Sequence, residues 1–302
     1  MTKFDAVGFG ALNVDKLFSV DRIAERGGES FVTYSTESCG GSAANTIVGL
    51  ARLGLKTGFI GKVADDREGN LLLQGFRSEN VDTEGIAVTK TGRSGVVMGF
   101  VDQQGERTLY VDAGVNDEID LSEIKLNHVL DTRLLHITSF AGDRSFESQV
   151  GILEKVSTQT RISFDPGMLY ARKGLAALRP IVQRAFVMLP NQAELRLLTG
   201  KEYKEGAEAL VDAGVKIVGV KLGEKGCYVT DGEENTLVAA ARMKPLDTTG
   251  AGDAWNAGFL YGFLQGKNLE QCGMLGNFAA SRCIVKMGAR TGLPLESELK
   301  QL

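Results

Sequence analysis

Short runs of β-branched and apolar residues alternate along this chain with longer runs whose apolar residues recur at helical spacing. This alternation is typical of a parallel sheet covered by helices on both faces. The strand candidates are residues 4–10, 56–63, 134–140, 161–167, 185–190, 217–223 and 227–231. The helix candidates between them include 42–55, 146–157, 191–200 and 273–288. The pattern predicts an α/β fold, a three-layer α/β/α sandwich with a mostly parallel central sheet.

Two segments interrupt this alternation. Residues 14–38 and 94–115 have period-two character and contain turn signals such as "RGGE" and "QQGE". They predict small antiparallel pieces that form a β lid beside the main sheet. Because no proline-rich linker, internal repeat or low-complexity tract divides the chain, we expect one domain over residues 1–302 with the lid inserted in its α/β core.

The composition excludes several classes of protein. A net charge of -4 over 302 residues offers no basic surplus for nucleic acid. No window approaches the ~18 apolar residues of a membrane span, and the N-terminus lacks a signal-like segment. Cys39, Cys227, Cys272 and Cys283 are scattered without a C-x-x-C pair, which favours reduced, buried thiols. We therefore expect a cytoplasmic protein with no nucleic-acid or membrane partner.

Two motif-like stretches do not carry a nucleotide-binding function. "VGFGALN" (7–13) starts like a dinucleotide fingerprint, but its third glycine position is Asn13 and the next residues alternate like a strand. "TGFIGKV" (57–63) lacks the first glycine and the final Ser or Thr of a phosphate-binding P-loop. His128 and His136 are the only histidines and lie in or beside apolar runs, so we interpret both as structural.

The stretch "DTTGAGDAWNAGFL" (247–260) is a glycine-rich loop that leads into a helix. Gly250 and Gly252 permit close backbone approach, and the free N–H groups of about residues 250–253 would attract a phosphoryl group. Asp253 has two interpretations. It is either an ordinary acidic residue in a first helical turn, or a general base that takes the proton of a hydroxyl nucleophile beside the bound phosphate.

Three other stretches carry similar alternatives. Gly40 and Gly41 form either a tight strand-to-helix turn or part of a ligand site, whereas Asn45 requires hydrogen-bond partners in an apolar helix, for which a sugar hydroxyl is a candidate. Asn191 and Glu194 have the spacing of a capping box. The stretch "KLGEKG" (221–226) is consistent with a simple hairpin.

Two of these stretches closely resemble the signatures of one family, the ribokinase-like or pfkB family of carbohydrate and nucleoside kinases. "CGGSAANTIVGLARLG" (39–54) resembles the N-terminal signature and "DTTGAGDAWNAGFL" the C-terminal one. "GALNVD" (10–15), "GKVADDREGN" (61–70, with Ala64 in place of a glycine) and "AGVN" (113–116) resemble further family segments. The resemblance implies the ribokinase-like sandwich with its lid, and it implies that Asp253 is the catalytic base. It further implies an anion hole at Gly250, Ala251 and Gly252, and acceptor-binding positions at Asn13, Asp15, Gly40, Gly41 and Asn45.

The resemblance also implies a nucleotide site. It places ATP beside the loop of Lys221, Gly223 and Gly226, with Asn277 where the adenine end is closed. Asn191 and Glu194 match the family's N-x-x-E motif, which supports Mg²⁺ and phosphate through water. A monovalent cation, K⁺, would be held at Asp247, Thr249 and the carbonyls near residues 284–290. Gly292 stands where ribokinase-type members carry Ser, which leaves activation by K⁺ open.

The implied activity is ATP-dependent transfer of the γ-phosphate to a hydroxymethyl group of a small sugar. Ribokinase-type chains carry a Glu near the position of Thr138, so the acceptor is not fixed as ribose, and a nucleoside kinase is the alternative. The lid aromatics Phe31, Tyr34, Phe100 and Tyr110 are suited to stack a nucleobase, but lid packing explains them equally. A catalytically silent sugar-binding relative is a remote third reading, since both signatures are intact. In the family such lids pair across a homodimer, which we expect as the partner.

Overall fold

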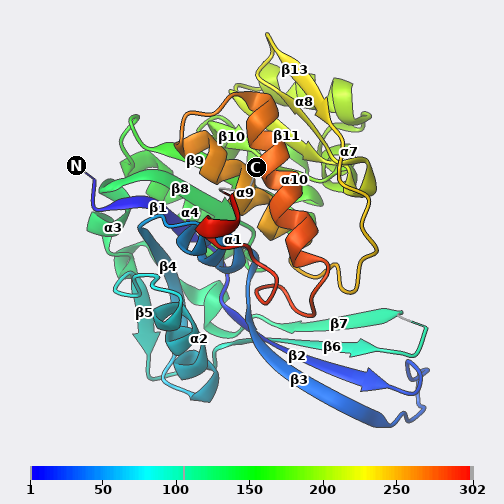
Figure 1. Cartoon of the computed structure of the whole chain (residues 1–302). Helices are drawn as coiled ribbons and strands as arrows, with labels where there is room; N and C mark the ends of the chain where they lie inside the picture. The colour runs from blue at the N-terminus through cyan, green and yellow to red at the C-terminus, as the bar shows by residue number, and fades with distance from the viewer. Residues whose placement is uncertain (1, 105, 300–302) are drawn as a thin grey trace.

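The computed structural model describes residues 2–104 and 106–299, and its largest element is a nine-stranded sheet in the order β13-β12-β11-β10-β9-β8-β1-β4-β5 (Figure 1). Neighbouring strands from β5 to β11 are parallel, and β11-β12-β13 are antiparallel. The mostly parallel sheet is therefore as predicted. The strands are β1 (Phe4–Phe9), β4 (Thr57–Ala64), β5 (Ile86–Thr89), β8 (Thr132–Thr138), β9 (Arg161–Asp165), β10 (Val187–Met188), β11 (Ile217–Lys221), β12 (Cys227–Thr230) and β13 (Asn235–Val238).

The strand predictions differ from the structure in two respects. The strand expected at 185–190 is assigned only to the two residues of β10, although the amides of Phe186 and Leu189 on either side also donate to carbonyls of β9. The strands β5 and β13 were not predicted. Both are four-residue edge strands with a single buried residue each, Ile86 and Val238, so they carry little of the apolar pattern that marks a buried strand.

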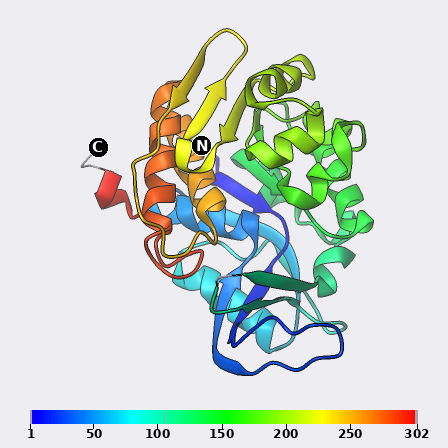
Figure 2. The same cartoon turned by 90° about the vertical axis from the view of Figure 1, so that its right-hand side faces the viewer.

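Helices cover both faces of the sheet and complete the three layers, as Figure 2 shows in side view. Apolar side chains from the two faces form two separate core clusters, and each cluster is shared with one helical layer. One layer contains α1 (Ser42–Arg52), α2 (Arg67–Ser78), α9 (Ala251–Leu264) and α10 (Leu269–Cys283). The other contains α4 (Asp143–Lys155), α5 (Gly167–Ala171), α6 (Gly174–Val182), α7 (Gln192–Thr199) and α8 (Tyr203–Asp212). Short elements are α3 (Leu126–Leu130), α11 (Glu296–Leu299), and the 3-10 turns η1 (Gly114–Glu118), η2 (Leu121–Glu123) and η3 (Gly223–Lys225).

A second, four-stranded sheet extends from the main body in the order β3-β2-β6-β7 (Figure 1). Its strands are β2 (Asn13–Val20), β3 (Val32–Gly40), β6 (Gly95–Val101) and β7 (Arg107–Asp112). We call it the small sheet. Each of the two predicted pieces is an antiparallel hairpin, as expected, and the two hairpins join through the parallel pair β2–β6. Both β2 and β6 leave the main body in the same direction, so they meet as parallel neighbours.

The topology brings the signature residues to one edge of the main sheet. The parallel strands β1, β9, β10 and β11 all end at this edge, and the helices α1, α7 and α9 begin there. In open α/β sheets, ligands bind at the carboxyl ends of the strands. The candidate site therefore lies where the small sheet joins the main body.

Two further expectations concern the chain as a whole. Among the described residues, no helix is long and apolar enough to cross a membrane. All four cysteines carry free thiols, and three of them are buried, in agreement with the sequence interpretation.

Candidate active site

The N-terminus of α9 presents backbone N–H groups to the carboxyl edge of the sheet. Gly250 caps the helix with a positive φ of 75°, a conformation that favours glycine. The amide of Ala251 donates to the Thr248 carbonyl at 3.2 Å. Within the described residues, the N–H groups of Gly252 and Asp253 have no acceptor. Of the residues expected to form an anion hole, Gly252 thus has an N–H group available to a ligand, whereas the Ala251 amide is already engaged.

Asp253 faces α1 from the first turn of α9. Its Oδ1 accepts a hydrogen bond from the Ser42 hydroxyl at 2.6 Å, and its Oδ2 accepts one from the Asn45 amide at 2.9 Å. Burial raises the pKa of Asp253 to about 6, and the two hydrogen bonds oppose that rise. At neutral pH the carboxylate is ionised but has a nearby pKa, the combination that suits a general base.

Arg290 fixes the orientation of Asn45. Its Nε donates to Asn45 Oδ1 at 2.8 Å, so the amide nitrogen of Asn45 must face Asp253. The same guanidinium donates to the Gly40 carbonyl at 3.3 Å. The Arg290 carbonyl in turn accepts from Arg52 at 2.7 Å. Sequence reasoning missed Arg290, because it lies 245 positions from its partner Asn45 and no local pattern marks it.

Steric constraints explain why the two residues before α1, Gly40 and Gly41, are glycines. Gly41 adopts a φ of 100°, and a Cβ atom there would collide with the Ala11 carbonyl oxygen. A Cβ atom at Gly40 would collide with the carboxylate of Asp15. Both positions therefore require glycine, and Gly40 leaves its space to the Asp15 side chain.

Asp15 and Asn13 project from the start of β2 beside Gly40. No described residue donates a hydrogen bond to the Asp15 carboxylate, and burial raises its pKa to about 6 although the nearby Arg290 charge lowers it. Asn116 donates to Asn13 Oδ1 at 2.9 Å and to the Leu12 carbonyl at 2.8 Å. These bonds orient the Asn13 amide and leave its nitrogen free to donate. The arrangement offers one acceptor group and one donor group to a polyhydroxyl ligand.

Lys221, at the end of β11, lies in a buried polar cluster that the sequence did not reveal. Its ammonium donates to Asp165 Oδ2 at 2.7 Å and to Asn256 Oδ1 at 3.2 Å. Asn256 also donates to Asp165 Oδ2 at 2.6 Å. Despite burial, the Lys221 charge and these hydrogen bonds keep the pKa of Asp165 low. Lys221 therefore belongs to the site through its charged end, and Asp165 and Asn256 hold it there.

Asn191 and Glu194 form the capping box that their spacing predicted. Asn191 Oδ1 accepts from the Glu194 amide at 2.9 Å, and Glu194 Oε2 accepts from the Asn191 amide at 2.8 Å. Glu194 is buried, and its other oxygen, Oε1, receives no hydrogen bond from a described residue. Burial, together with the Asp165 charge, raises the pKa of Glu194 to about 7. The capping box thus engages Oε2 of Glu194 and leaves Oε1 available to a ligand.

Two further predicted positions lie in the loop after β11, and a third, Asn277, lies in α10. Gly223 and Gly226 have φ values of 63° and 95°, so both need glycine's freedom. Asn277 Oδ1 accepts from the Trp255 indole at 3.0 Å, and its Nδ2 donates to the Val238 carbonyl at 3.0 Å. Both polar atoms of the Asn277 side chain are therefore engaged within the protein.

The segment before α9 is tied to the loop after α10. Asp247 accepts from the amides of Thr249 at 2.9 Å and Gly288 at 2.8 Å. A Cβ atom at Gly292 would lie 2.5 Å from the Arg282 carbonyl oxygen. A serine at this position would therefore require a backbone shift.

The two histidines lie apart from this cluster of groups. His136 is fully buried against the Ser163 hydroxyl at 3.1 Å, and burial lowers its pKa to about 4, so it is neutral. His128 lies 3.2 Å from Asp82 near the N-terminus. Their geometry agrees with a structural role for both.

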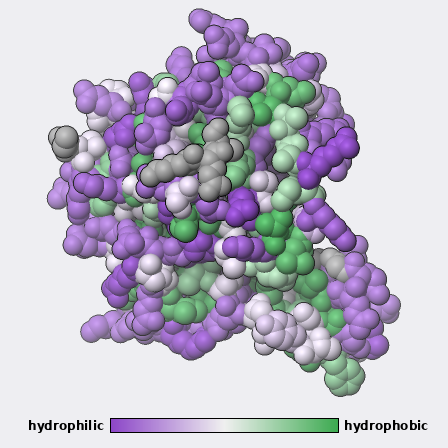
Figure 3. All heavy atoms as spheres, in the orientation of Figure 1, coloured by the Kyte–Doolittle hydropathy of each residue, from purple (hydrophilic) through white to green (hydrophobic). Residues whose placement is uncertain are grey.

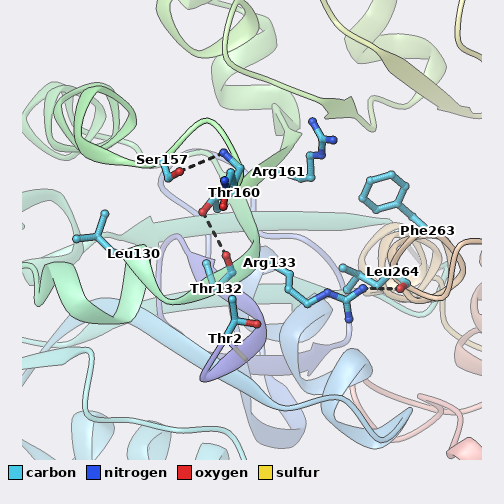
Figure 4. A pocket seen from close by; sticks show the side chains of 10 residues that line it. Thr2, Leu130, Thr132, Arg133, Ser157, Thr160, Arg161, Phe263 and Leu264 are labelled. Carbon is cyan, nitrogen blue, oxygen red and sulfur yellow. Dashed lines mark hydrogen bonds between the residues drawn. The ribbon is translucent and has the colours of Figure 1, made fainter.

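A cavity of about 390 Å³ lies at the opposite edge of the main sheet (Figure 4). Arg133, on its wall, donates to the Leu264 carbonyl at 2.7 Å and to Asp5 at 2.9 Å. The second arginine, Arg161, stacks on the Phe186 ring at 4.1 Å. The cavity is lined by Thr2, Leu130, Thr132, Arg133, Ser157, Gln159, Thr160, Arg161, Phe263 and Leu264. None of the signature residues reaches it.

The sequence profile of "pfkB family carbohydrate kinase" matches residues 5–296. An uncharacterized sugar kinase from Archaeoglobus fulgidus is 46% identical over 82% of this chain and 98% of its own length. An ATP-dependent ribose-1-phosphate kinase from Halopiger xanaduensis is 31% identical over 93% of this chain and 92% of its own. The structure of Arabidopsis thaliana ribokinase complexed with ribose and ATP has a TM-score of 0.88 at 22% identity, with 100% of this chain and 98% of that chain covered. The resemblance inferred from the two signatures is confirmed over nearly the whole chain.

Proposed function

The chain belongs to the pfkB family of carbohydrate kinases, and from this premise we propose that it transfers the γ-phosphate of ATP to a hydroxymethyl group of a small sugar. Membership makes it a sugar kinase, a phosphotransferase with an alcohol group as acceptor. The observation that carries the finer proposal is Asp253. Its carboxylate, with a pKa of about 6, belongs to the same first turn of α9 as the unpaired N–H groups of Gly252 and Asp253.

The proposed step is an in-line displacement at the γ-phosphorus. The acceptor hydroxyl loses its proton to Asp253, its oxygen forms a bond to phosphorus, and the bond from phosphorus to the bridging oxygen of ADP breaks. The N–H groups of Gly252 and Asp253, at the positive end of the α9 dipole, stabilise the charge on the transferred group. Ser42 and Asn45 keep the carboxylate aimed during the transfer.

Mg²⁺ fits the polar groups beside this helix terminus. The Glu194 oxygen that the cap leaves free is the hard ligand type that a hydrated Mg²⁺ prefers. Burial, and after it the Asp165 charge, raises the pKa of Glu194 to about 7, and a bound divalent cation would favour its ionised form. When bound, Mg²⁺ neutralises charge on the phosphates. We propose that Glu194 holds it through water, with Asn191 fixing Glu194.

The residues around Asp247 bear on K⁺, the second ion that the resemblance implies. Asp247 and Thr249 lie where the family holds a monovalent cation, but Asp247 is engaged by two backbone amides. Gly292 leaves no room for the serine of ribokinase-type members. Kinetics with and without K⁺ therefore form a separate arm of the assay.

The position of the lid aromatics favours a sugar over a nucleoside. Tyr34 pairs with Ser19 of β2, and Phe100 pairs with Phe18. Along β2, Ser19 lies six residues beyond Asn13 and Phe18 lies five, which corresponds to roughly 16–20 Å at about 3.3 Å per residue. Phe100 also stacks on Phe18 with ring centroids 5.2 Å apart. Such distances keep a nucleobase bound near Asn13 away from both rings, whereas a small sugar needs only the polar groups at the strand start.

The test is a screen of ATP consumption over ribose, ribose 1-phosphate, fructose, 2-keto-3-deoxygluconate, adenosine, cytidine, guanosine and inosine, with and without K⁺. Asp253→Asn is the blank, because the new amide oxygen can still accept from Asn45 and its NH₂ group can donate to the Ser42 hydroxyl, but it is no base. We expect one sugar to be phosphorylated and the variant to lose about 10²–10⁴ in kcat. A nucleoside as the best acceptor would refute the sugar assignment, and unchanged turnover of Asp253→Asn would refute the base.

We also propose that the small sheet pairs two copies of this chain. The sheet carries exposed apolar and aromatic side chains, and the lower right of Figure 3, where it extends from the main body, includes green surface. These exposed side chains are Phe31, Val32, Tyr34, Leu109, Tyr110 and Val111. Exposed apolar patches of this kind mark interaction sites. Light scattering on the purified protein should give the mass of two chains, and Tyr34→Lys with Val111→Lys should give the mass of one. A monomeric wild-type protein would refute the pairing.

A further inference from the structure

The glycine-rich segment at the start of α9 contains no cationic side chain, yet a lysine from another strand lies beside it. A Cβ atom at Gly252 would lie 3.6 Å from the Lys221 ammonium. The two residues are 31 positions apart in the sequence. The carboxyl end of β11 and the N-terminus of α9 thus combine a full positive charge with the unpaired N–H groups of the helix.

One N–H group of the Lys221 ammonium has no hydrogen-bond acceptor among the described residues. An ammonium has three N–H groups, and two of them reach Asp165 and Asn256. The Lys221 side chain is only 12% exposed and that of Asp165 6%. Within the described residues, no third acceptor contacts the ammonium. Buried polar groups seldom lack a partner, so this donor indicates that a ligand completes the set.

We propose that Lys221 is a catalytic residue whose third N–H donates to an oxygen of the transferred phosphoryl group. The inference rests on the proposed function, and it adds a charged donor to the backbone amides of Gly252 and Asp253. Asp165 and Asn256 are positioning residues that hold the ammonium at the helix terminus. A charge-assisted hydrogen bond of this kind is roughly twice as strong as a neutral one.

The proton balance of the step is unchanged by this donor. Lys221 remains protonated throughout, since it donates a hydrogen bond and transfers no proton. The acceptor proton still goes to Asp253, and the bonding electrons of the broken phosphorus–oxygen bond stay on ADP. The ammonium acts by opposing the charge that the phosphoryl oxygens carry in the transition state.

A purely structural role makes a different prediction. If Lys221 serves only to neutralise Asp165, its removal harms the protein through an uncompensated buried carboxylate. That harm should vanish once Asp165 is itself neutral. A double-mutant cycle of Lys221→Met and Asp165→Asn therefore separates the two roles.

The experiment compares wild type, Lys221→Met, Asp165→Asn, the double variant and the control Lys216→Met. Lys216 is exposed and lies just before the other end of β11, so it matches the chemistry without touching the site. For each protein, urea unfolding establishes the folded state and steady-state kinetics give kcat. Calorimetry at saturating Mg²⁺ gives the dissociation constants of ADP and of the non-hydrolysable analogue AMP-PNP.

We expect Lys221→Met to lower kcat by about 10²–10³, the usual effect of losing one donor to developing charge. We expect a smaller but clear loss when Lys221 is removed in the Asp165→Asn background, because that change loosens the ammonium without removing its charge, and no change for Lys216→Met. AMP-PNP should bind about tenfold or more weakly to the Lys221 variants, whereas ADP should bind nearly as before. A double variant as active as Asp165→Asn alone would overturn the inference, as would equal weakening of both nucleotides.

The calorimetric result separates this inference from the proposed function. If no acceptor in the screen is phosphorylated by the wild type, the proposed acceptor class fails, while the difference between AMP-PNP and ADP still tests Lys221. If the wild type is active and the ratio of the AMP-PNP and ADP dissociation constants is the same in Lys221→Met as in the wild type, only the inference fails.

Discussion

Replacing Ser42 by Ala should shift the pH dependence of the enzyme. The Ser42 hydroxyl donates to Asp253 Oδ1 at 2.6 Å, and this bond lowers the pKa of a carboxyl group that burial has raised to about 6. The bond favours the ionised form, so its loss raises the pKa further. The acid limb of the kcat/KM profile should therefore move to higher pH.

The size of the shift follows from the strength of the bond. A hydrogen bond to a charged group contributes about 1.5–3 kcal/mol, and one pKa unit corresponds to about 1.4 kcal/mol. The pKa of Asp253 should rise by about one to two units, to roughly 7–8. At pH 7 the ionised fraction would fall from about nine-tenths to between one half and one tenth. The rate at pH 7 should fall about two- to tenfold, and it should recover near pH 9.

The assay is kcat/KM against pH from about 5 to 9.5 with the acceptor that the screen identifies. Asp15 and Glu194 also titrate in this range, with pKa values of about 6 and about 7, but Ser42 donates to neither. The difference between the two profiles therefore isolates Asp253. Thr46→Val is the matched control, because Thr46 donates to the Asp253 carbonyl at 3.3 Å and leaves the carboxylate untouched.

Two results would refute this reasoning. An acid limb that stays at the same pH in Ser42→Ala would mean that Asp253 does not control it. A loss of activity that high pH does not restore would mean that Ser42 positions the base or the acceptor rather than sets a pKa.

Three other substitutions test the packing and the acceptor site. Gly258→Ala places a methyl group against the Leu275 backbone carbonyl of α10, so the free energy of unfolding should fall by about 1–3 kcal/mol in urea titrations; an unchanged value would contradict the close approach. Asn116→Ala removes the bond that orients Asn13, so the KM of the acceptor should rise about tenfold, the equivalent of one hydrogen bond. A fall in kcat at constant KM would contradict that role. Gly292→Ser meets the carbonyl 2.5 Å away at the end of α10, so thermal unfolding should show a loss of about 1–3 kcal/mol and kinetics no gain of K⁺ activation. A stable, K⁺-dependent variant would contradict both expectations.

Most of the main sheet could be predicted because its strands are buried on both faces. A strand such as β4 is buried along its whole length, so it appears in the sequence as a continuous apolar run. The edge strands β5 and β13 have no such run. The parallel pairing of β2 with β6 could not be predicted either, because it depends on the directions in which two distant segments leave the main body.

The site was predictable where a local motif carries it and unpredictable where distant residues complete it. The motif around Asp253 and the glycine pair before α1 lie in continuous stretches with defined backbone requirements. By contrast, Ser42, Arg290 and Asp165 act through partners between 56 and 245 positions away. Only the folded chain brings these side chains together, so spacing within the sequence carries no signal of them.

The packing of α9 has a consequence for how this enzyme moves. Glycines allow close approach on three sides of the helix, since Gly258 lies against the α10 backbone, Gly49 of α1 lies against Ala257, and Gly219 of β11 lies against the Trp255 ring. A helix held in this way cannot tilt or slide without opening voids in the core. The proposed base Asp253 and the unpaired amides at the start of α9 are therefore held in the most rigidly packed part of the main body.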